Sequence, residues 1–130
     1  MADHPNAELF RRGYTAFQQG DMDAIRALLD ADIVWHQPGH HHLSGDYRGI
    51  DAVLDEFGKT FQETNGTYKV EIHDILANDT HAVALASNSG ERDGKHLSDR
   101  YTHVAHIEGG RLKESWIFSE NQDKVDEFWG

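Results

Sequence analysis

The stretch KHLSDRYTHVAHIEGGRLKESWIFSE, residues 95–120, decides the fold. Apolar and polar side chains alternate on both sides of Gly109-Gly110, which is typical of two antiparallel strands joined by a tight turn. A two-residue turn predicts five pairs on one face: Ile107 with Leu112, Ala105 with Glu114, His103 with Trp116, Tyr101 with Phe118, and Asp99 with Glu120. This face is rich in large apolar groups, so we expect it to be the covered one. One β-bulge would break the register.

Two further strands precede this hairpin. Residues 67–77 and 81–91 alternate with a period of two and meet at Asn78-Asp79. A three-residue loop ending at Gly94 would join the second of them to the hairpin and place Leu85 and Ser87 on the covered face. The four strands therefore predict an antiparallel meander.

Helical patterns occupy most of the remaining chain. Apolar side chains from residue 6 recur at three- and four-residue spacing until Gly20, and Asp21 then suits the N-cap of a second helix. A third helix begins near Ile50, and its apolar stripe includes Phe57 and Phe61. A short helix over residues 123–129 ends the chain. Helices first and strands second indicate an α+β fold, and 130 residues suit a single domain.

The segment DIVWHQPGHHHLSGDYRG, residues 32–49, joins a short strand to the third helix. The strand, about 32–37, carries Trp35 and Gln37 and stops at Pro38-Gly39. Polar, histidine-rich residues follow, as is typical of the rim of a pocket. The run His40–His42 predicts a polar loop or lid. A metal site is the weaker alternative, because adjacent residues rarely chelate one ion together.

Composition excludes several classes of protein. The chain carries 12 basic and 23 acidic residues, a net charge of −11, which disfavours nucleic acid as a partner. It has no cysteine for a disulfide or thiolate metal site, and no apolar run approaches the roughly 18 residues of a membrane span. We therefore expect a cytoplasmic protein that binds neither membranes nor cofactors.

Three segments together resemble a known family: GYTAFQQGDMDAIRALLDADIVWHQPG (13–39), SGDYRGIDAVLDEF (44–57) and HVAHIEGGRLKESWIFSEN (103–121). They are similar to the SnoaL-like branch of the nuclear transport factor 2-like superfamily, which also holds ketosteroid isomerases and polyketide cyclases. The resemblance implies one domain over residues 1–130. It also implies a cone-shaped, curved antiparallel sheet wrapped around helices, a deep apolar pocket, and homodimers formed through the outer sheet face.

The resemblance gives a mixed answer about chemistry. Tyr14 lies near where the isomerases place a phenol that stabilises an enolate. Their catalytic carboxylate would fall at Gln37 or His36, and their second carboxylate near His103, so the isomerase reaction is doubtful. The cyclases carry an acidic base four residues after a tryptophan, as Glu120 follows Trp116. Cyclase-like or other acid/base chemistry is better supported.

Two functions remain open. One is a cofactor-independent isomerase, cyclase or dehydratase that acts on a small apolar carbonyl or polyketide-like substrate; the other is a non-catalytic module that binds a small ligand or only dimerises. The enzyme requires His103, Glu120, His36 and Tyr14 to converge in one pocket. Otherwise His103 is a core histidine, Tyr14 a core aromatic residue and Glu120 a solvated carboxylate. The predicted substrate-binding residues are Trp35, Gln37, Phe57, Phe61, Leu85, Ser87, Asp99, Tyr101, Trp116 and Phe118.

Overall fold

In the computed structural model, which describes residues 3–130, three helices and two strands, of nine and four residues, precede a run of four long strands. The elements are α1 (Pro5–Gln18), α2 (Met22–Leu28), β1 (Leu29–Gln37), β2 (Gly45–Arg48), α3 (Ile50–Glu63), β3 (Lys69–Ala77), β4 (His81–Arg92), β5 (Lys95–Glu108), β6 (Arg111–Ser119) and α4 (Gln122–Trp129). The first two residues of the predicted domain lie outside the described residues. The helices and the four long strands follow the sequence prediction.

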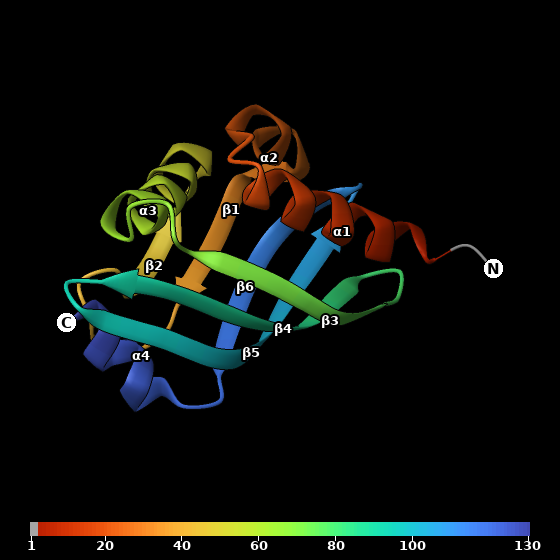
Figure 1. Cartoon of the computed structure of the whole chain (residues 1–130). Coiled ribbons are helices and arrows are strands. Elements are labelled where there is room, and N and C mark those ends of the chain that lie inside the picture. The colour runs from red at the N-terminus through yellow and green to blue at the C-terminus, as the bar shows by residue number, and fades with distance from the viewer. Residues whose placement is uncertain (1–2) are drawn as a thin grey trace.

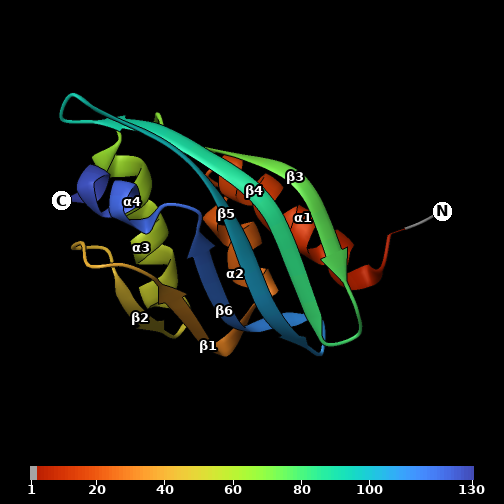
Figure 2. The same cartoon turned by 90° about the horizontal axis from the view of Figure 1, so that it is seen from below.

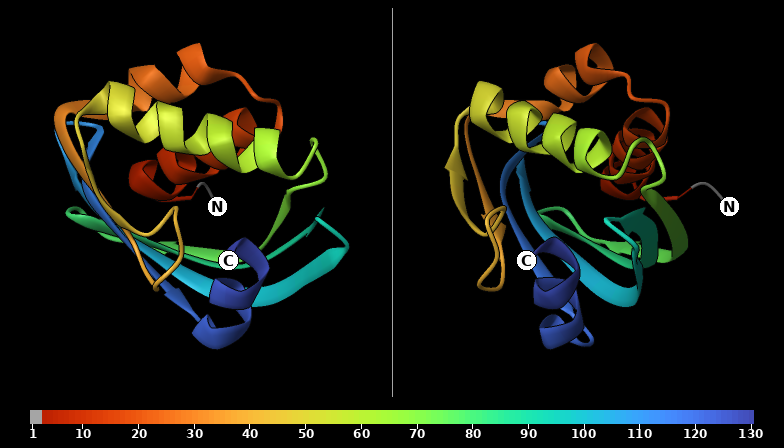
Figure 3. Two further views of the ribbon diagram at one scale, coloured as in Figure 1. Left: turned by 90° about the vertical axis from the view of Figure 1, so that its left-hand side faces the viewer. Right: turned by 60° about the vertical axis from the view of Figure 1, so that its left-hand side comes forward.

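The strands form one sheet of six in the order β2-β1-β6-β5-β4-β3 (Figure 1). Strands β3 to β6 are the predicted antiparallel meander, whereas β1 runs parallel to β6. The sheet curls so that α1, α2 and α3 cover one face (Figure 3). The α+β fold with a curved sheet around helices is thus confirmed. Strand β2 was not predicted, because its four residues GDYR form a short edge strand without apolar alternation.

Helix α4 lies apart from the other three, beside the turn that joins β4 to β5 (Figure 2). Arg92 and Lys95, at the two ends of that turn, hold it there. The Arg92 guanidinium donates to the Phe128 carbonyl at 3.1 Å, and Lys95 Nζ donates to the Glu127 carbonyl at 3.0 Å. Basic groups on these carbonyls complement the negative end of the helix dipole. Within residues 3–130, no helix is both long and apolar enough to cross a membrane.

The turn between β4 and β5 is shorter than predicted. It contains two residues, Asp93 and Gly94, and pairs Arg92 with Lys95 instead of Glu91 with Lys95. Both turn residues have positive φ angles of 50° and 77°, as in the tight turns that match strand twist. Losing one loop residue moves every β4 side chain to the opposite face of the sheet. The covered face of β4 consequently presents Ala82, Ala84, Ala86, Asn88 and Gly90.

A bulge in β6 changes the second predicted register. Ile107 pairs with Leu112 as expected, but His106 then pairs with Glu114, so Lys113 has no opposite residue. Beyond this point His103 lies opposite Ile117 instead of Trp116. The bulge keeps Leu112 and Ile117 on the covered face and turns Trp116 outward. Strand β5 keeps its predicted orientation, with His103 buried and His106 on the outer face.

Candidate active site

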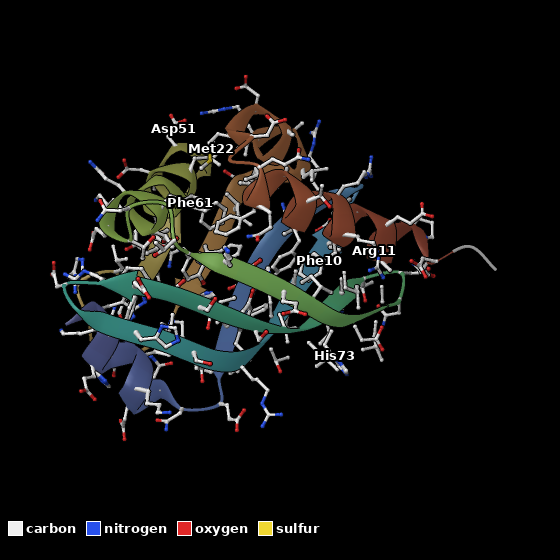
Figure 4. The ribbon with its side chains drawn as sticks, viewed as in Figure 1. Phe10, Arg11, Met22, Asp51, Phe61 and His73 are labelled. Carbon is white, nitrogen blue, oxygen red and sulfur yellow. The ribbon has the colours of Figure 1, made fainter. Side chains whose placement is uncertain are left out.

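A cavity with about 120 Å³ of free space lies between the helices and the covered face of the sheet. Figure 4 shows Phe10 between α1 and the sheet, whereas Asp51 on α3 and His73 on β3 lie at the periphery. Apolar side chains of α1 and α2 close one end, and Trp129 of α4 lines the other. A cavity of about 150 Å³ can admit benzene, so the free space here suits a molecule built around one ring.

Two phenols and an imidazole form a hydrogen-bonded chain along the cavity wall. The Tyr101 hydroxyl donates to the Tyr14 hydroxyl at 3.2 Å, and the Tyr14 oxygen lies 2.8 Å from His103 Nδ1. We assign the single Tyr14 proton to this contact, because the Tyr14 oxygen already accepts from Tyr101; the neutral imidazole then carries its own proton on Nε2. Burial raises the pKa of both phenols, so both stay protonated.

His103 is therefore a fixed hydrogen-bond donor at the cavity. Its residue is 3% exposed, and the rings of Phe10 and Trp35 lie 4.6 and 4.8 Å from the imidazole, centroid to centroid. Burial lowers its pKa to about 3, so the imidazole is neutral at neutral pH. Nε2 is buried and has no hydrogen-bond partner among residues 3–130. A buried donor of this kind is costly unless a ligand or water accepts its proton.

Glu56 supplies an ionisable carboxyl group to the same cavity. It lies on α3, is 4% exposed, and accepts a hydrogen bond from the Thr60 hydroxyl at 3.3 Å. Burial raises its pKa to about 7, although the Thr60 hydrogen bond opposes the shift. The carboxyl group can therefore both give and take a proton near neutral pH.

A second group of polar side chains lies near α4; we call His41, Tyr68 and Asn88 the α4-end cluster. The rings of His41 and Tyr68 lie 6.2 and 6.3 Å from the Trp129 ring, centroid to centroid. The Asn88 amide donates to the Tyr68 hydroxyl at 3.0 Å. All three residues line the cavity. The cavity thus has polar groups near α4 as well as at His103.

The sequence profile of the SnoaL-like domain matches residues 10–115. The chain belongs to the SnoaL-like domain family. An uncharacterised protein of Mycobacterium tuberculosis is 31% identical to this SnoaL-like chain over 130 residues, which cover 99% of each protein.

Two solved structures are similar in both sequence and fold. Bal32a, from a soil-derived mobile gene cassette, is 35% identical with a TM-score of 0.94, and the match covers 97% of each chain. A protein of unknown function with a cystatin-like fold from Xanthomonas campestris is 31% identical with a TM-score of 0.88, over 95% of this chain and 96% of its own. Both place the SnoaL-like chain in the superfamily that its sequence resembles.

Six of the residues predicted for the site line the cavity of this SnoaL-like domain. They come from α1, β1, α3 and β5 and include the whole phenol–imidazole chain: Tyr14, Trp35, Gln37, Phe57, Tyr101 and His103. Gln37 is held by Trp35, whose indole N–H donates to the Gln37 side-chain oxygen at 3.1 Å. Two of the four predicted catalytic residues, Tyr14 and His103, therefore lie together.

The other two predicted catalytic residues lie outside the cavity. Glu120 follows the end of β6, where Arg100 donates to both carboxylate oxygens at 2.6 and 3.0 Å and holds the pKa of Glu120 below its usual range. His36 lies between Asp46 and Glu114, with nitrogen–oxygen distances of 2.7 and 2.5 Å. Burial alone would lower the pKa of His36, but the two carboxylates raise it. Neither side chain reaches the phenol–imidazole chain.

Six predicted substrate-binding residues also lie elsewhere. The shortened turn places Leu85 and Ser87 on the outer face, and the β6 bulge does the same for Trp116 and Phe118. Trp116 stacks on His36 with 5.7 Å between ring centroids. Asp99 and Phe61 are on the covered side but do not line the cavity: Asp99 accepts from the Asn121 backbone, and Phe61 packs on Phe17.

The sequence did contain signals for the polar residues that were missed. Glu56 lies three residues after Val53 and four before Thr60, so a carboxylate interrupts the apolar stripe of a helix. His41 is in the histidine run, where the three rings have separate partners: His42 bonds to Glu63 at 2.6 Å, His40 lies 3.8 Å from Asp126, and His41 lines the cavity. Asn88 was missed because its face depended on the length of the β4–β5 turn.

Proposed function

We propose that this SnoaL-like domain is a cofactor-independent enzyme that moves a proton on a small, mostly apolar carbonyl compound. The observation that carries the proposal is the buried Nε2 of His103, which has no hydrogen-bond partner among residues 3–130 and carries the ring proton when Tyr14 donates to Nδ1. The size of the cavity favours a substrate built around one ring over a multi-ring polyketide.

His103 acts in this scheme as a donor to the carbonyl oxygen. Because burial lowers the pKa of the imidazolium form to about 3, the ring gains no second proton at neutral pH, and the remaining N–H of a neutral imidazole is too weakly acidic to be lost. When a proton leaves the carbon next to the carbonyl, negative charge develops on the oxygen and strengthens the hydrogen bond from Nε2. A preorganised donor of this kind is typically worth about 10²–10³-fold in rate.

Glu56 replaces Glu120 and His36 as the group that transfers the proton. Its carboxylate takes a proton from the carbon next to the carbonyl, and the C–H electron pair moves to form the enolate. If the substrate is an unsaturated ketone, the protonated Glu56 returns the proton to a different carbon of the conjugated enolate, and the shifted double bond gives an isomerised product. In a dehydratase, the enolate expels a hydroxyl group from the neighbouring carbon, and Glu56 protonates it to water. In an aldol cyclase, the enolate carbon attacks a second carbonyl, and Glu56 protonates the resulting alkoxide.

The test is proton exchange on simple ring ketones. In D₂O, the wild-type protein should exchange the hydrogens next to the carbonyl of cyclohexanone or acetophenone, followed by NMR. Glu56→Gln should slow exchange by about 10²-fold or more, and His103→Phe by a similar factor. His106→Phe on the outer face is the matched control. Equal rates in wild type and Glu56→Gln would exclude Glu56 as the base.

A non-catalytic ligand-binding module is the second candidate. It is favoured by the position of Glu120 and His36, because the enzyme hypothesis required both of them in the pocket. The same experiment separates the two candidates: a binding module would shift or broaden the ketone signals on binding and leave their exchange rate at that of buffer.

We also propose that the domain forms a homodimer through the outer face of its sheet. Phe118 is 58% exposed, and its cross-strand neighbour Thr102 separates it from Leu85, which is also exposed. A groove on this face passes these residues and the Arg100–Glu120 pair. An exposed apolar patch with a polar rim is typical of an interface between subunits.

A further inference from the structure

The α4-end cluster is not used by the proton transfer proposed above, although it lines the same cavity. Two hydrogen bonds, one from a backbone N–H and one from a side-chain amide, show which atoms of the cluster are donors and which are acceptors. The backbone N–H of Leu43 donates to His41 Nδ1 at 3.1 Å, so Nδ1 has no proton and the neutral ring carries one on Nε2. Burial lowers the pKa of His41, which favours this neutral form.

Asn88 offers the complementary group. Its NH₂ donates to Tyr68, so its Oδ1 is an acceptor. Neither His41 Nε2 nor Asn88 Oδ1 has a hydrogen-bond partner in the described part of the chain, and both atoms are buried. His41 as a whole is only 8% exposed. His41 Nε2 is therefore a donor and Asn88 Oδ1 an acceptor at the α4 end, and the Tyr68 hydroxyl, which accepts from Asn88, offers its own proton as a further donor.

The cluster lies well away from the donor at His103. Across β4 and β5, Asn88 pairs with Asp99 and Ala84 pairs with His103. Asp99 and His103 are four residues apart on one strand, which is about 13 Å along the backbone at roughly 3.3 Å per residue. The side chains of Asn88 and His103 both line the one cavity, which apolar side chains such as Phe57 and Ile117 also line.

We infer that the cavity binds a ligand with polar groups at both ends: a carbonyl oxygen at His103 and a hydroxyl at the α4-end cluster. A hydroxyl can accept from His41 Nε2 and donate to Asn88 Oδ1. A carboxylate could only accept, so it would face the Asn88 oxygen and share the cavity with Glu56. The ligand class is a hydroxy-substituted ring ketone, and this deepens the proposed function because it rests on the same cavity.

Three probes of similar size test the inference by isothermal titration calorimetry. 4′-Hydroxyacetophenone carries both groups, acetophenone lacks the hydroxyl, and 4-ethylphenol lacks the carbonyl. The first should bind about tenfold more tightly than either of the others. His41→Phe should remove the advantage of the hydroxyl and leave acetophenone binding unchanged. The control is His42→Phe, because His42 bonds to Glu63 and does not line the cavity.

A measurement on the wild-type protein avoids dependence on the folding of a variant. In ¹⁵N-histidine spectra, 4′-hydroxyacetophenone should shift His41 Nε2–H and His103 Nε2–H together, whereas acetophenone should shift only the latter. Binding of acetophenone without any gain from the hydroxyl, or equal His41 shifts from both ketones, would overturn the two-ended ligand and leave the proposed function standing. If none of the ketones binds, both proposals are wrong.

Discussion

At the scale of single residues, Glu56 makes the stability of the protein depend on pH. Its pKa is about 7 in the folded chain and 4.5 in the reference state, so between these values the folded chain holds a proton that the unfolded chain has lost. Stability therefore falls as pH rises from 4.5 to 7, by up to about 3 kcal/mol from this group.

Glu56→Gln should remove that loss. We expect the variant to be more stable than wild type by up to about 3 kcal/mol at pH 8 and equally stable at pH 4.5, as measured by urea unfolding. Glu127→Gln, at an exposed position of α4, is the control and should show no such difference in stability. A Glu56→Gln variant less stable at pH 8 would mean that the charged carboxylate has a partner that stabilises it.

His103 gives the stability of the protein the opposite dependence on pH. Because burial lowers its pKa from 6.5 to about 3, the unfolded chain binds a proton below pH 6.5 that the folded chain does not. Stability is lost as pH falls, by about 2 kcal/mol between pH 6.5 and 4.5. His103→Phe should abolish this share of the acid sensitivity. Unfolding curves at the two pH values check it, and His106→Phe should retain the wild-type slope.

At the scale of elements, the sequence predicts the positions of helices and strands, because these depend on the local spacing of apolar residues. The Asp21 cap is confirmed, since its side chain accepts from the Ala24 backbone, and α1, α3 and the four long strands lie where their patterns indicate. The register between neighbouring strands, by contrast, changes when a turn or a bulge gains or loses one residue. One loop residue fewer at Asp93-Gly94 and one extra residue at Lys113 each change which side chains face inward. Four predicted substrate-binding residues face outward for this reason: Leu85, Ser87, Trp116 and Phe118.

The Gly109-Gly110 turn gives a direct test of hairpin geometry. Both glycines have positive φ angles, 60° and 76°, and a Cβ at either position would meet no atom within 4 Å. Only backbone conformation therefore limits substitution. Gly109→Asn should change the free energy of unfolding by less than about 0.5 kcal/mol, whereas Gly109→Val should cost about 1–2 kcal/mol. Equal costs measured by urea unfolding would point to a steric cause.

At the scale of the whole molecule, the outer face of the sheet should decide the oligomeric state. Light scattering at micromolar concentration should report a dimer, and Phe118→Glu should convert it to a monomer by placing a charge in the proposed interface. Lys59→Glu, at an exposed position of α3 on the other side of the sheet, is the matched control and should remain dimeric. A wild-type monomer at this concentration would exclude the dimer.

The cavity as a whole could be predicted better than its chemistry. Residues from α1, β1, α3 and β5 converge as the fold requires, so Tyr14, Trp35, Phe57 and His103 were within reach of the sequence. Glu56 was not proposed, because a carboxylate on an amphipathic helix is usually solvated. Its position within the apolar stripe of α3 was a signal, but its burial depends on how α3 packs against β1 and β2, which the helix pattern alone does not show.

The positions of the three tryptophans give the protein separate optical reporters. Trp35 lies against His103, Trp129 lines the α4 end of the cavity, and Trp116 is on the outer face beside His36. An occupant of the cavity should quench or shift the emission of Trp35 and Trp129, whereas subunit association should change that of Trp116. The fluorescence of variants that each retain a single tryptophan would therefore distinguish ligand binding in the cavity from association of subunits.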